Sequence, residues 1–310
     1  MASTKNKNSL IELMRFFFAL WVLYYHSFVP IKTSAFSDGF LAVEFFFVLS
    51  GFYLIRSIDK YTSQPINTGL FSFLKHRFSA IAIPFLINEI FVLYYSIFIE
   101  ASYNFFFGFL WYIRDLFVAM SVIFILRKLI KGDRKFYLVM VGLSVMAFFA
   151  FQWFPLMAWP GGPLRSIAAM PIGMLAALIP KLKPRKETAK DKVLIAIIIA
   201  VGLALSSIAC LAIAYSTNKT LFIQYLLVIV VYPAMLYFAS CVNFNNRVLN
   251  WIGSLSFPIY SFQCILRVVQ YELIDDRTFL FILLWVLVFV YSAIMSILNH
   301  KKKNDNHLTI

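Results

Sequence analysis

Apolar residues fall into about ten stretches of about twenty residues each, separated by shorter polar connections. A helix of about twenty residues spans the roughly 30 Å hydrocarbon core of a bilayer, so each stretch is long enough to cross it. The pattern predicts an all-α polytopic membrane protein in which residues 1–310 form a single domain. The expected spans are about 10–28, 39–57, 78–98, 106–126, 136–154, 164–180, 193–215, 221–241, 248–270 and 278–298.

Composition supports a membrane protein and excludes other classes. The chain is 62% hydrophobic and 14% charged, with a mean hydropathy of +0.81, whereas a soluble domain of this length exposes more charge. The net charge of +14 is spread over clusters between the apolar stretches, so we expect a lipid bilayer and no nucleic acid as partner. The three cysteines lie in apolar stretches without metal-ligand spacing, so neither a disulfide nor a metal site is predicted.

Basic residues alternate in number from one connection to the next. Of the 28 lysines and arginines, about 21 lie on one side of the predicted layout and about 3 on the other, and the rest lie in spans or at their ends. Cytoplasmic loops are enriched in Lys and Arg. Both termini are therefore expected in the cytoplasm, as tails over residues 1–9 and 299–310.

The first span carries two polar residues, Arg15 and His26, in an otherwise apolar stretch. Eleven residues of helix turn through about 1100° and rise about 16 Å, so both side chains share one face near opposite membrane surfaces. Charged groups in hydrocarbon are costly and often functional, and imidazole is suited to move a proton near neutral pH. The alternative is that Arg15 reaches a lipid headgroup and His26 only ends the helix.

The second span runs inward, so Glu44 begins near the same outer surface as His26. A buried carboxylate beside an imidazole fixes its orientation and stabilises the imidazolium, and we expect Glu44 to do this for His26. Further along, Ser50 and Gly51 form a small polar step in an aromatic run. That step indicates either a functional contact or close packing of two helices.

Arg114 and Asp115 follow Trp111 in the fourth span. Neighbouring residues of a helix point about 100° apart, so each of the two charges is expected to have its partner on another helix. Such an ion pair has either a functional or a purely structural role.

These residues also carry a resemblance. Residues 12–15, Glu-Leu-Met-Arg, followed ten residues later by His26, resemble the opening of the acyltransferase-3 family of integral-membrane O-acyltransferases. Residues 42–52 are similar to the family's second-helix signature, Gly-Val-Asp-x-Phe-Phe-x-x-Ser-Gly-Phe in type. Residues 110–116 resemble a Leu-Trp-Phe-x-Arg-Asp-Leu segment, and residues 252–260 resemble a Gly-x-x-Ser-Tyr-x-x-Tyr step. The matches occur in family order and span nearly the whole chain.

The chain departs from the family pattern at four positions. Ala42 replaces a usual Gly, and Glu44 stands where Asp is commoner. Ile81 occupies the place of a second Arg after Arg77, and Gln263 stands where a late His is often found. The last two changes put an anionic contact and a histidine role in doubt, while Arg15 and His26 are retained.

The resemblance implies transfer of an acyl group, most often acetyl from acetyl-CoA, to a hydroxyl of a cell-envelope carbohydrate. His26 would act as general base or acyl relay, oriented by Glu44, and Arg15 and Arg77 would meet the CoA phosphates. The resemblance further implies substrate contacts by Ser50, Trp111, Arg114, Asp115 and Tyr260. Acyl-CoA is expected as co-substrate, with no bound cofactor, in a bacterial plasma membrane; the oligomeric state stays open.

Two other classes of function are weighed beside the transferase. A transporter or flippase for a lipid-linked glycan would use intramembrane charges as a substrate path, but the chain shows no clear repeated halves. A haem or quinone protein needs opposed ligands, and the other histidines lie in connections or the tail. The acceptor stays open: Trp153 and Trp159 in an outer loop either stack sugar rings or form an interfacial belt.

Overall fold

The computed structural model describes residues 8–26, 39–79, 111–154, 161–179, 224–242 and 244–261, with scattered positions in 81–93, 193–208 and 282–297. Every regular element among these residues is a helix, and the described part contains no strand. The all-α prediction is therefore confirmed. Contacts group the chain into unit 1, comprising Met1–Lys32, Ile81–Gly108 and Asn243–Ile310, and unit 2, comprising Thr33–Ala80 and Phe109–Val242. The single-domain layout stays a prediction.

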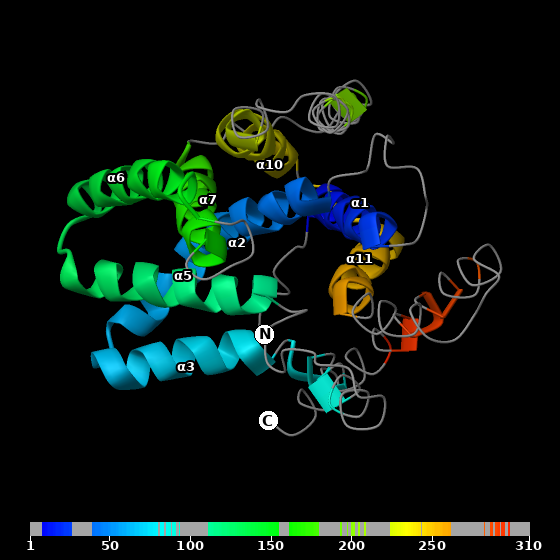
Figure 1. Ribbon diagram of the computed structural model, residues 1–310, viewed down its shortest axis with the longest axis horizontal. Coiled ribbons are helices and arrows are strands. Elements are labelled where there is room, and N and C mark those ends of the chain that lie inside the picture. The colour runs from blue at the N-terminus through cyan, green and yellow to red at the C-terminus, as the bar shows by residue number, and fades with distance from the viewer. Residues whose placement is uncertain are drawn as a thin grey trace. The chain divides into compact units, whose positions relative to one another are not determined.

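Unit 2 is built around one central helix, α7 (Gly161–Leu178), which is buried along most of its length. Helix α7 lies between α6 and α2 and also packs on α5 (Figure 1). The remaining elements contact this group at its edges. The helices of unit 2 are α2 (Gly39–Thr62), α3 (Ile66–Ser79), α5 (Trp111–Leu129), α6 (Asp133–Phe151), the π-helix η1 (Leu227–Val231) and α10 (Tyr232–Cys241).

Helices α2 and α7 make the most extensive contact within unit 2. Their backbones approach closely because glycines face each other across the crossing. A Cβ on Gly51 would collide with the carbonyl of Met170, and a Cβ on Gly173 would collide with the carbonyl of Val48. Small residues at a crossing allow such close packing in membranes. The structural alternative for the step at Ser50 and Gly51 is therefore confirmed for Gly51.

The helical stretch Gln224–Cys241 changes from α to π geometry over η1 and back to α at α10. Pro233 lies in the first turn of α10 and has no N–H to continue the α-helical ladder. The N–H of Tyr232 instead donates to the carbonyl of Leu227, five residues back. The Tyr232 hydroxyl donates to the carbonyl of Leu41 over 2.9 Å, which fixes this stretch against α2.

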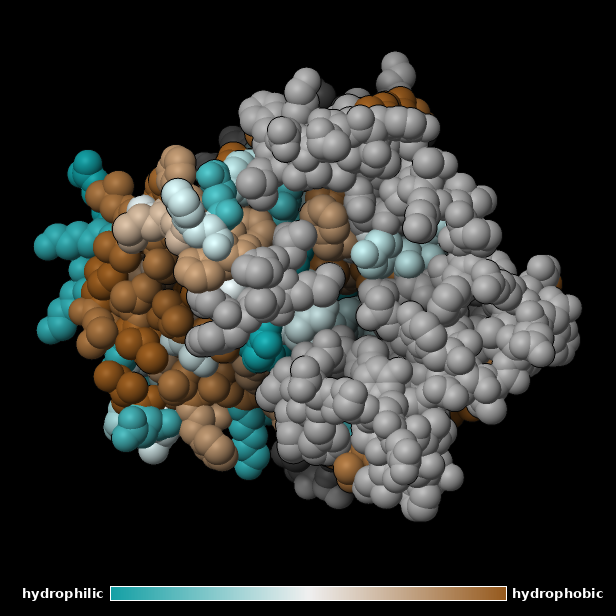
Figure 2. Space-filling view, viewed as in Figure 1, coloured by the Kyte–Doolittle hydropathy of each residue, from teal (hydrophilic) through white to brown (hydrophobic). Residues whose placement is uncertain are grey.

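Three described helices are long and apolar enough to cross a membrane: Asp133–Phe151, Gly161–Leu178 and Gln224–Cys241. The apolar part of α2, Gly39–Ile55, is shorter than these three. These four agree with the spans expected at 136–154, 164–180, 221–241 and 39–57. Figure 2 shows apolar surface over the α5–α6 part, with hydrophilic side chains where the two helices connect. The membrane character is confirmed, whereas ten spans and cytoplasmic termini stay predictions.

The connection expected at 58–77 is mostly helical. Helix α2 runs on to Thr62, and after a turn at Pro65 the chain forms α3, which ends at Ser79. Most α3 side chains are partly or fully exposed, while Phe73 is buried and stacks on Phe124 of α5 at 5.5 Å. Phe78 of α3 also packs edge-on against Phe117 of α5. These aromatic contacts hold α3 on the unit, and its apolar stretch is shorter than the membrane-length runs that hydropathy detects.

Unit 1 contains α1 (Ser9–His26) packed on α11 (Arg247–Ser254). Asn8 and Asn246 accept hydrogen bonds from the first backbone N–H groups of α1 and α11 respectively, as N-cap residues do. The Ser9 backbone N–H donates to the carbonyl of Phe244 over 2.8 Å. Two segments far apart in sequence are thereby joined at their helix starts.

Candidate functional site

A buried ion pair lies at the start of α2 and α7 in unit 2. Arg165, Glu44 and Gln224 are 1%, 2% and 3% exposed. The Nε of Arg165 and the Nε2 of Gln224 each donate to Oε1 of Glu44 over 2.7 Å. A buried charge is tolerated only when it is paired and hydrogen-bonded. Glu44 is therefore held as part of a fixed polar centre in an apolar helical unit.

Arg165 is held on several sides. Its Nη2 donates to the carbonyl of Phe40 over 3.3 Å. The guanidinium carbon lies 5.0 Å from the centroid of the Trp111 ring and 5.8 Å from that of Phe40, within the range of a cation–π contact. The buried Nη1 has no hydrogen-bond partner among the described residues. This arginine therefore has a locked position and one unused donor.

Arg114 and Asp115 bond each other, so the expectation that each pairs with another helix is wrong. The Nε of Arg114 donates to Oδ1 of Asp115 over 2.7 Å, because the long arginine side chain bends back across the angle between the two positions. Asp115 is fully buried. Its Oδ2 and the Nη2 of Arg114 are buried and have no hydrogen-bond partner in the described part of the chain.

Helix α7 packs its first turn directly on this pair. A Cβ on Gly162 would collide with Oδ2 of Asp115 and would crowd Nη2 of Arg114. The hydroxyl of Ser166 lies 2.8 Å from the carbonyls of Asp115 and Pro163, either of which can accept its proton. Glycine at position 162 thus lets the carboxylate reach the start of α7.

The starts of four helical stretches therefore meet in one polar centre, which we call the Glu44–Arg165 centre: Glu44, Trp111, Arg114, Asp115, Arg165 and Gln224. In the predicted layout these stretches all begin at the outer membrane surface. Ser50 lies six residues beyond Glu44, and its hydroxyl is 3.5 Å from that of Tyr112. Ser50 therefore adjoins α5 at a greater depth in the bilayer.

A second polar cluster lies at the opposite end of α5. Arg127 donates to Asp59 and pairs with Asp133, both over 2.8 Å, and its guanidinium lies over the ring of Phe136. The hydrogen bond that Arg127 donates to Asp59 is the main cause that raises the pKa of Arg127. Lys128 donates to the carbonyls of Thr62 and Gln64. These bonds fix the connection between α2 and α3.

Arg77 lies near this cluster, in the last turn of α3. Its Nη2 donates to the hydroxyl of Ser57 on α2, and its guanidinium lies 5.6 Å from the ring of Phe73. Burial lowers the pKa of Arg77. No contact joins Arg77 to the Glu44–Arg165 centre among the described residues, so the structure does not bring them together.

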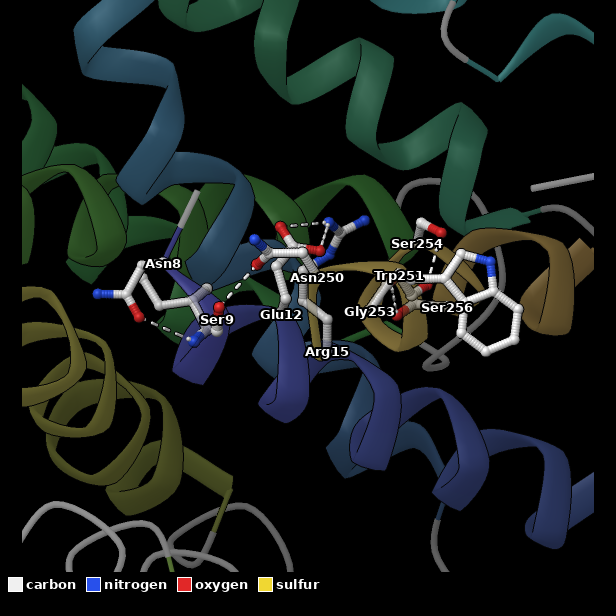
Figure 3. Close-up of polar contacts among 10 residues, drawn as sticks. Asn8, Ser9, Glu12, Arg15, Asn250, Trp251, Gly253, Ser254 and Ser256 are labelled. Atoms are coloured by element: carbon white, nitrogen blue, oxygen red, sulfur yellow. Dashed lines mark hydrogen bonds and ion pairs between the residues drawn. The ribbon is translucent and has the colours of Figure 1, made fainter. Parts of the chain in front are cut away.

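In unit 1, Arg15 pairs with Glu12 on the same helix. Its Nη1 lies 2.8 and 3.0 Å from the two carboxylate oxygens of Glu12 (Figure 3). Glu12 is buried against Gly253 of α11, where a Cβ would collide with its side chain. Beside it, the hydroxyl of Ser9 lies 2.9 Å from Oδ1 of Asn250, and Asn246 donates its N–H to Ser9. The Arg15 side chain is 28% exposed, so it can still meet a ligand.

Four other expected residues remain to be placed. His26 is the last residue of α1, and its side chain lies outside the described part, so its contact with Glu44 stays a prediction. Tyr260 is buried in unit 1 with its ring 6.2 Å from that of Phe257. Trp153 is 84% exposed after α6, whereas Trp159 lies outside the described residues.

Sequence reasoning missed Arg165 and Gln224. Arg165 is a cation just inside an apolar span, and such a residue requires a buried partner. Gln224 is likewise a polar side chain near the start of an apolar span. Both were detectable as polar interruptions, but their pairing with Glu44 depends on contacts across 121 and 180 positions.

The described residues contain no group of three or more His, Cys, Asp or Glu side chains suited to a metal ion. In a comparison with family models, residues 8–299 match Acyl_transf_3, which is described as an acyltransferase domain. No curated protein and no solved structure matches the chain.

Proposed function

This chain belongs to the acyltransferase-3 family, and from that premise we propose that it moves an acetyl group from acetyl-CoA to a hydroxyl of a cell-surface polysaccharide or lipid-linked glycan. The observation that carries the proposal is the match over residues 8–299, within which His26 ends α1 and α2 carries a buried carboxylate. The chain is a membrane acyltransferase; donor, base and acceptor are the proposed parts.

The proposed reaction needs a base because a sugar hydroxyl has a pKa far above 7. His26 takes the hydroxyl proton as the oxygen attacks the thioester carbonyl. The tetrahedral adduct then breaks its C–S bond, and His26 returns the proton to the departing CoA sulfur. The products are the O-acetyl ester and CoA, so atoms and charges balance.

Glu44 is proposed to orient His26 and stabilise the imidazolium. Its Oε1 accepts two hydrogen bonds, from Arg165 and Gln224, which hold the carboxylate in place. A carboxylate fixed on one oxygen presents the other in a defined direction, which suits an orienting role. This arrangement supports the proposal and gives Arg165 and Gln224 a supporting part.

The donor is proposed to bind from the cytoplasmic side, through its phosphates. Arg15 and Arg77 are the candidate cations, and both are partly exposed side chains already oriented by one partner each. Arginine suits phosphate because its guanidinium offers several donors in one plane. We place the enzyme in the bacterial plasma membrane, with the acceptor outside.

The proposal is tested with purified protein in proteoliposomes, labelled acetyl-CoA and envelope glycans from a deletion strain. Labelled glycan should form with the wild type and fall by about 10²-fold or more with His26→Gln, which keeps hydrogen bonding but loses the base. His26→Ala should be equally inactive. An active His26→Gln protein at normal membrane level would overturn the assignment, since a structural histidine tolerates an amide.

The pH profile supplies a second test of the base. The transfer rate should rise with pH through an ionisation near neutrality, because His26 must be neutral to accept a proton. A nearby charged carboxylate favours the imidazolium, so Glu44→Gln should move this ionisation to lower pH. An unchanged profile in Glu44→Gln would separate the two residues.

A further inference from the structure

We propose that Arg114, Asp115 and Arg165 form the acceptor site, binding neighbouring hydroxyl groups of a neutral sugar. This inference rests on the proposed transfer to a glycan and names the residues that hold it. It extends the Glu44–Arg165 centre from a structural ion pair to a ligand-binding site.

The evidence begins with three buried polar atoms. Nη2 of Arg114, Oδ2 of Asp115 and Nη1 of Arg165 have no hydrogen-bond partner within the described ranges. An unsatisfied buried donor or acceptor costs about 1–3 kcal/mol, more when charged, so native structures rarely retain several together. Three in one region indicate groups kept for a ligand.

The three atoms belong to side chains that lie together. Gly162 borders both Oδ2 of Asp115 and Nη2 of Arg114. Ser166, next to Arg165, bonds the backbone of Asp115. Trp111, in the same turn of α5, lies against the Arg165 guanidinium. The first turns of α5 and α7 thus present two donors and one acceptor in one place.

The charges indicate what kind of ligand fits. Arg114 and Asp115 form one ion pair, and Arg165 and Glu44 form another, so the centre is balanced and lacks the positive excess that binds phosphate. A sugar hydroxyl donates one hydrogen bond and accepts others. One hydroxyl can therefore donate to Asp115 while it or its neighbour accepts from the two arginines.

The site also lies at the end that the topology assigns to the outer surface. Asp115 and Arg127 are twelve residues apart on α5, about 18 Å along its axis, and the basic cluster around Arg127 marks the expected cytoplasmic end. An acceptor outside the cell would meet the Asp115 end first. CoA phosphates would meet the Arg127 end.

The test measures sugar binding without the acyl donor. Saturation-transfer NMR on the full-length protein in detergent uses methyl β-D-glucopyranoside and methyl β-D-galactopyranoside as probes. The wild type should give a signal that falls about tenfold or more in Asp115→Asn, because a charged acceptor is lost. Asp59→Asn is the matched control at the opposite end of the unit and should leave the signal unchanged.

Arg114→Lys guards against a variant that only fails to fold. This side chain is 23% exposed and is not bonded to Glu44. The lysine variant therefore keeps a positive charge beside Asp115 but lacks the Nη2 donor of Arg114. It should keep the wild-type elution profile and weaken sugar binding.

Several outcomes overturn the site. These are no sugar signal in the wild type, equal signals in wild type, Asp115→Asn and Arg114→Lys, or displacement of the probes by inorganic pyrophosphate. Failure of the proposed function is seen separately. If the protein binds the probes in a manner that depends on Asp115 but never labels a glycan, the sugar site holds and the proposed acetyl transfer is wrong. If the protein transfers acetyl groups but Asp115→Asn leaves the KM for the acceptor unchanged, the proposed function holds and the proposed acceptor site is wrong.

Discussion

At the scale of single residues, the chain uses two kinds of ion pair. Arg165 and Glu44 are almost fully buried, so each depends on the other for solvation. Arg127 instead pairs with carboxylates whose side chains are 57% and 72% exposed. Water screens the second kind, and such pairs contribute little to stability. The buried pair is costly to break but not necessarily stabilising as a whole.

This difference predicts how much each substitution lowers the free energy of unfolding. Arg165→Gln or Glu44→Gln should lower the free energy of unfolding by about 3–5 kcal/mol, because each leaves a buried charge unpaired. Arg127→Gln should lower it by about 1 kcal/mol or less. Thermal unfolding in detergent measures the order. A double variant, Glu44→Gln with Arg165→Gln, should recover part of the loss, and a double loss equal to the sum of the two single losses would contradict a mutual pairing.

The pairing of Arg15 with Glu12 allows a test with opposite signs. If Arg15 binds CoA phosphate, Arg15→Gln should raise the KM for acetyl-CoA by about tenfold or more, the loss of one charge-assisted hydrogen bond. Glu12→Gln should leave this KM unchanged or lower it, because the guanidinium is released from its carboxylate. Steady-state kinetics against acetyl-CoA distinguish the two.

If Arg15 has only a structural role, both variants break the same pair and should behave alike. Equal stability losses with an unchanged KM in both would sink the donor assignment. Arg15→Lys gives the control for charge, because it keeps the cation but not the planar set of donors.

At the scale of elements, the contact between α2 and α7 decides where the polar centre forms. The crossing at Gly51 and Gly173 lies deeper along both helices than Glu44 and Arg165. Close approach there sets how the two helix starts meet. The glycines therefore position the buried ion pair without touching it.

Alanine substitutions test this crossing. Gly173→Ala and Gly51→Ala should each destabilise unit 2 by more than the usual 1–3 kcal/mol of overpacking, because the new methyl meets a backbone carbonyl and not a flexible side chain. Gly142→Ala on α6 is the control, since nothing lies within 4 Å of its Cβ. It should be neutral or slightly stabilising, as measured by thermal unfolding.

The elements show what sequence can predict. Hydropathy locates α2, α6, α7 and the stretch Gln224–Cys241 within a few residues, because lipid demands long apolar helices. It misses α3, whose apolar stretch over residues 70–74 is far shorter than a membrane span and which is held by aromatic contacts with α5. The motif residues Glu44, Trp111 and Asp115 are predicted as site residues and lie together, but Arg165 and Gln224 join them only through tertiary contacts.

At the scale of the whole molecule, charge is divided along the helices. Within unit 2, the centre at the helix starts is balanced and buried, whereas the opposite end of α5 carries Arg127 and Lys128. This division matches a plan in which a neutral glycan arrives outside and an anionic donor arrives inside. The excess of basic residues on one side of the predicted layout is expected to face the cytoplasm.

That plan makes orientation the prediction on which the rest depends. Thr68 on α3 and Trp153 after α6 are both exposed, and the layout places them in the cytoplasm and outside respectively. In a variant with the three native cysteines replaced, an impermeant maleimide should label Trp153→Cys in intact cells. Thr68→Cys should be labelled only after permeabilisation, because the basic clusters beside α3 keep it inside. Labelling of Thr68→Cys in intact cells would show that the orientation is opposite to the predicted one. The Glu44–Arg165 centre would then lie on the cytoplasmic side, and an external acceptor could not reach it directly.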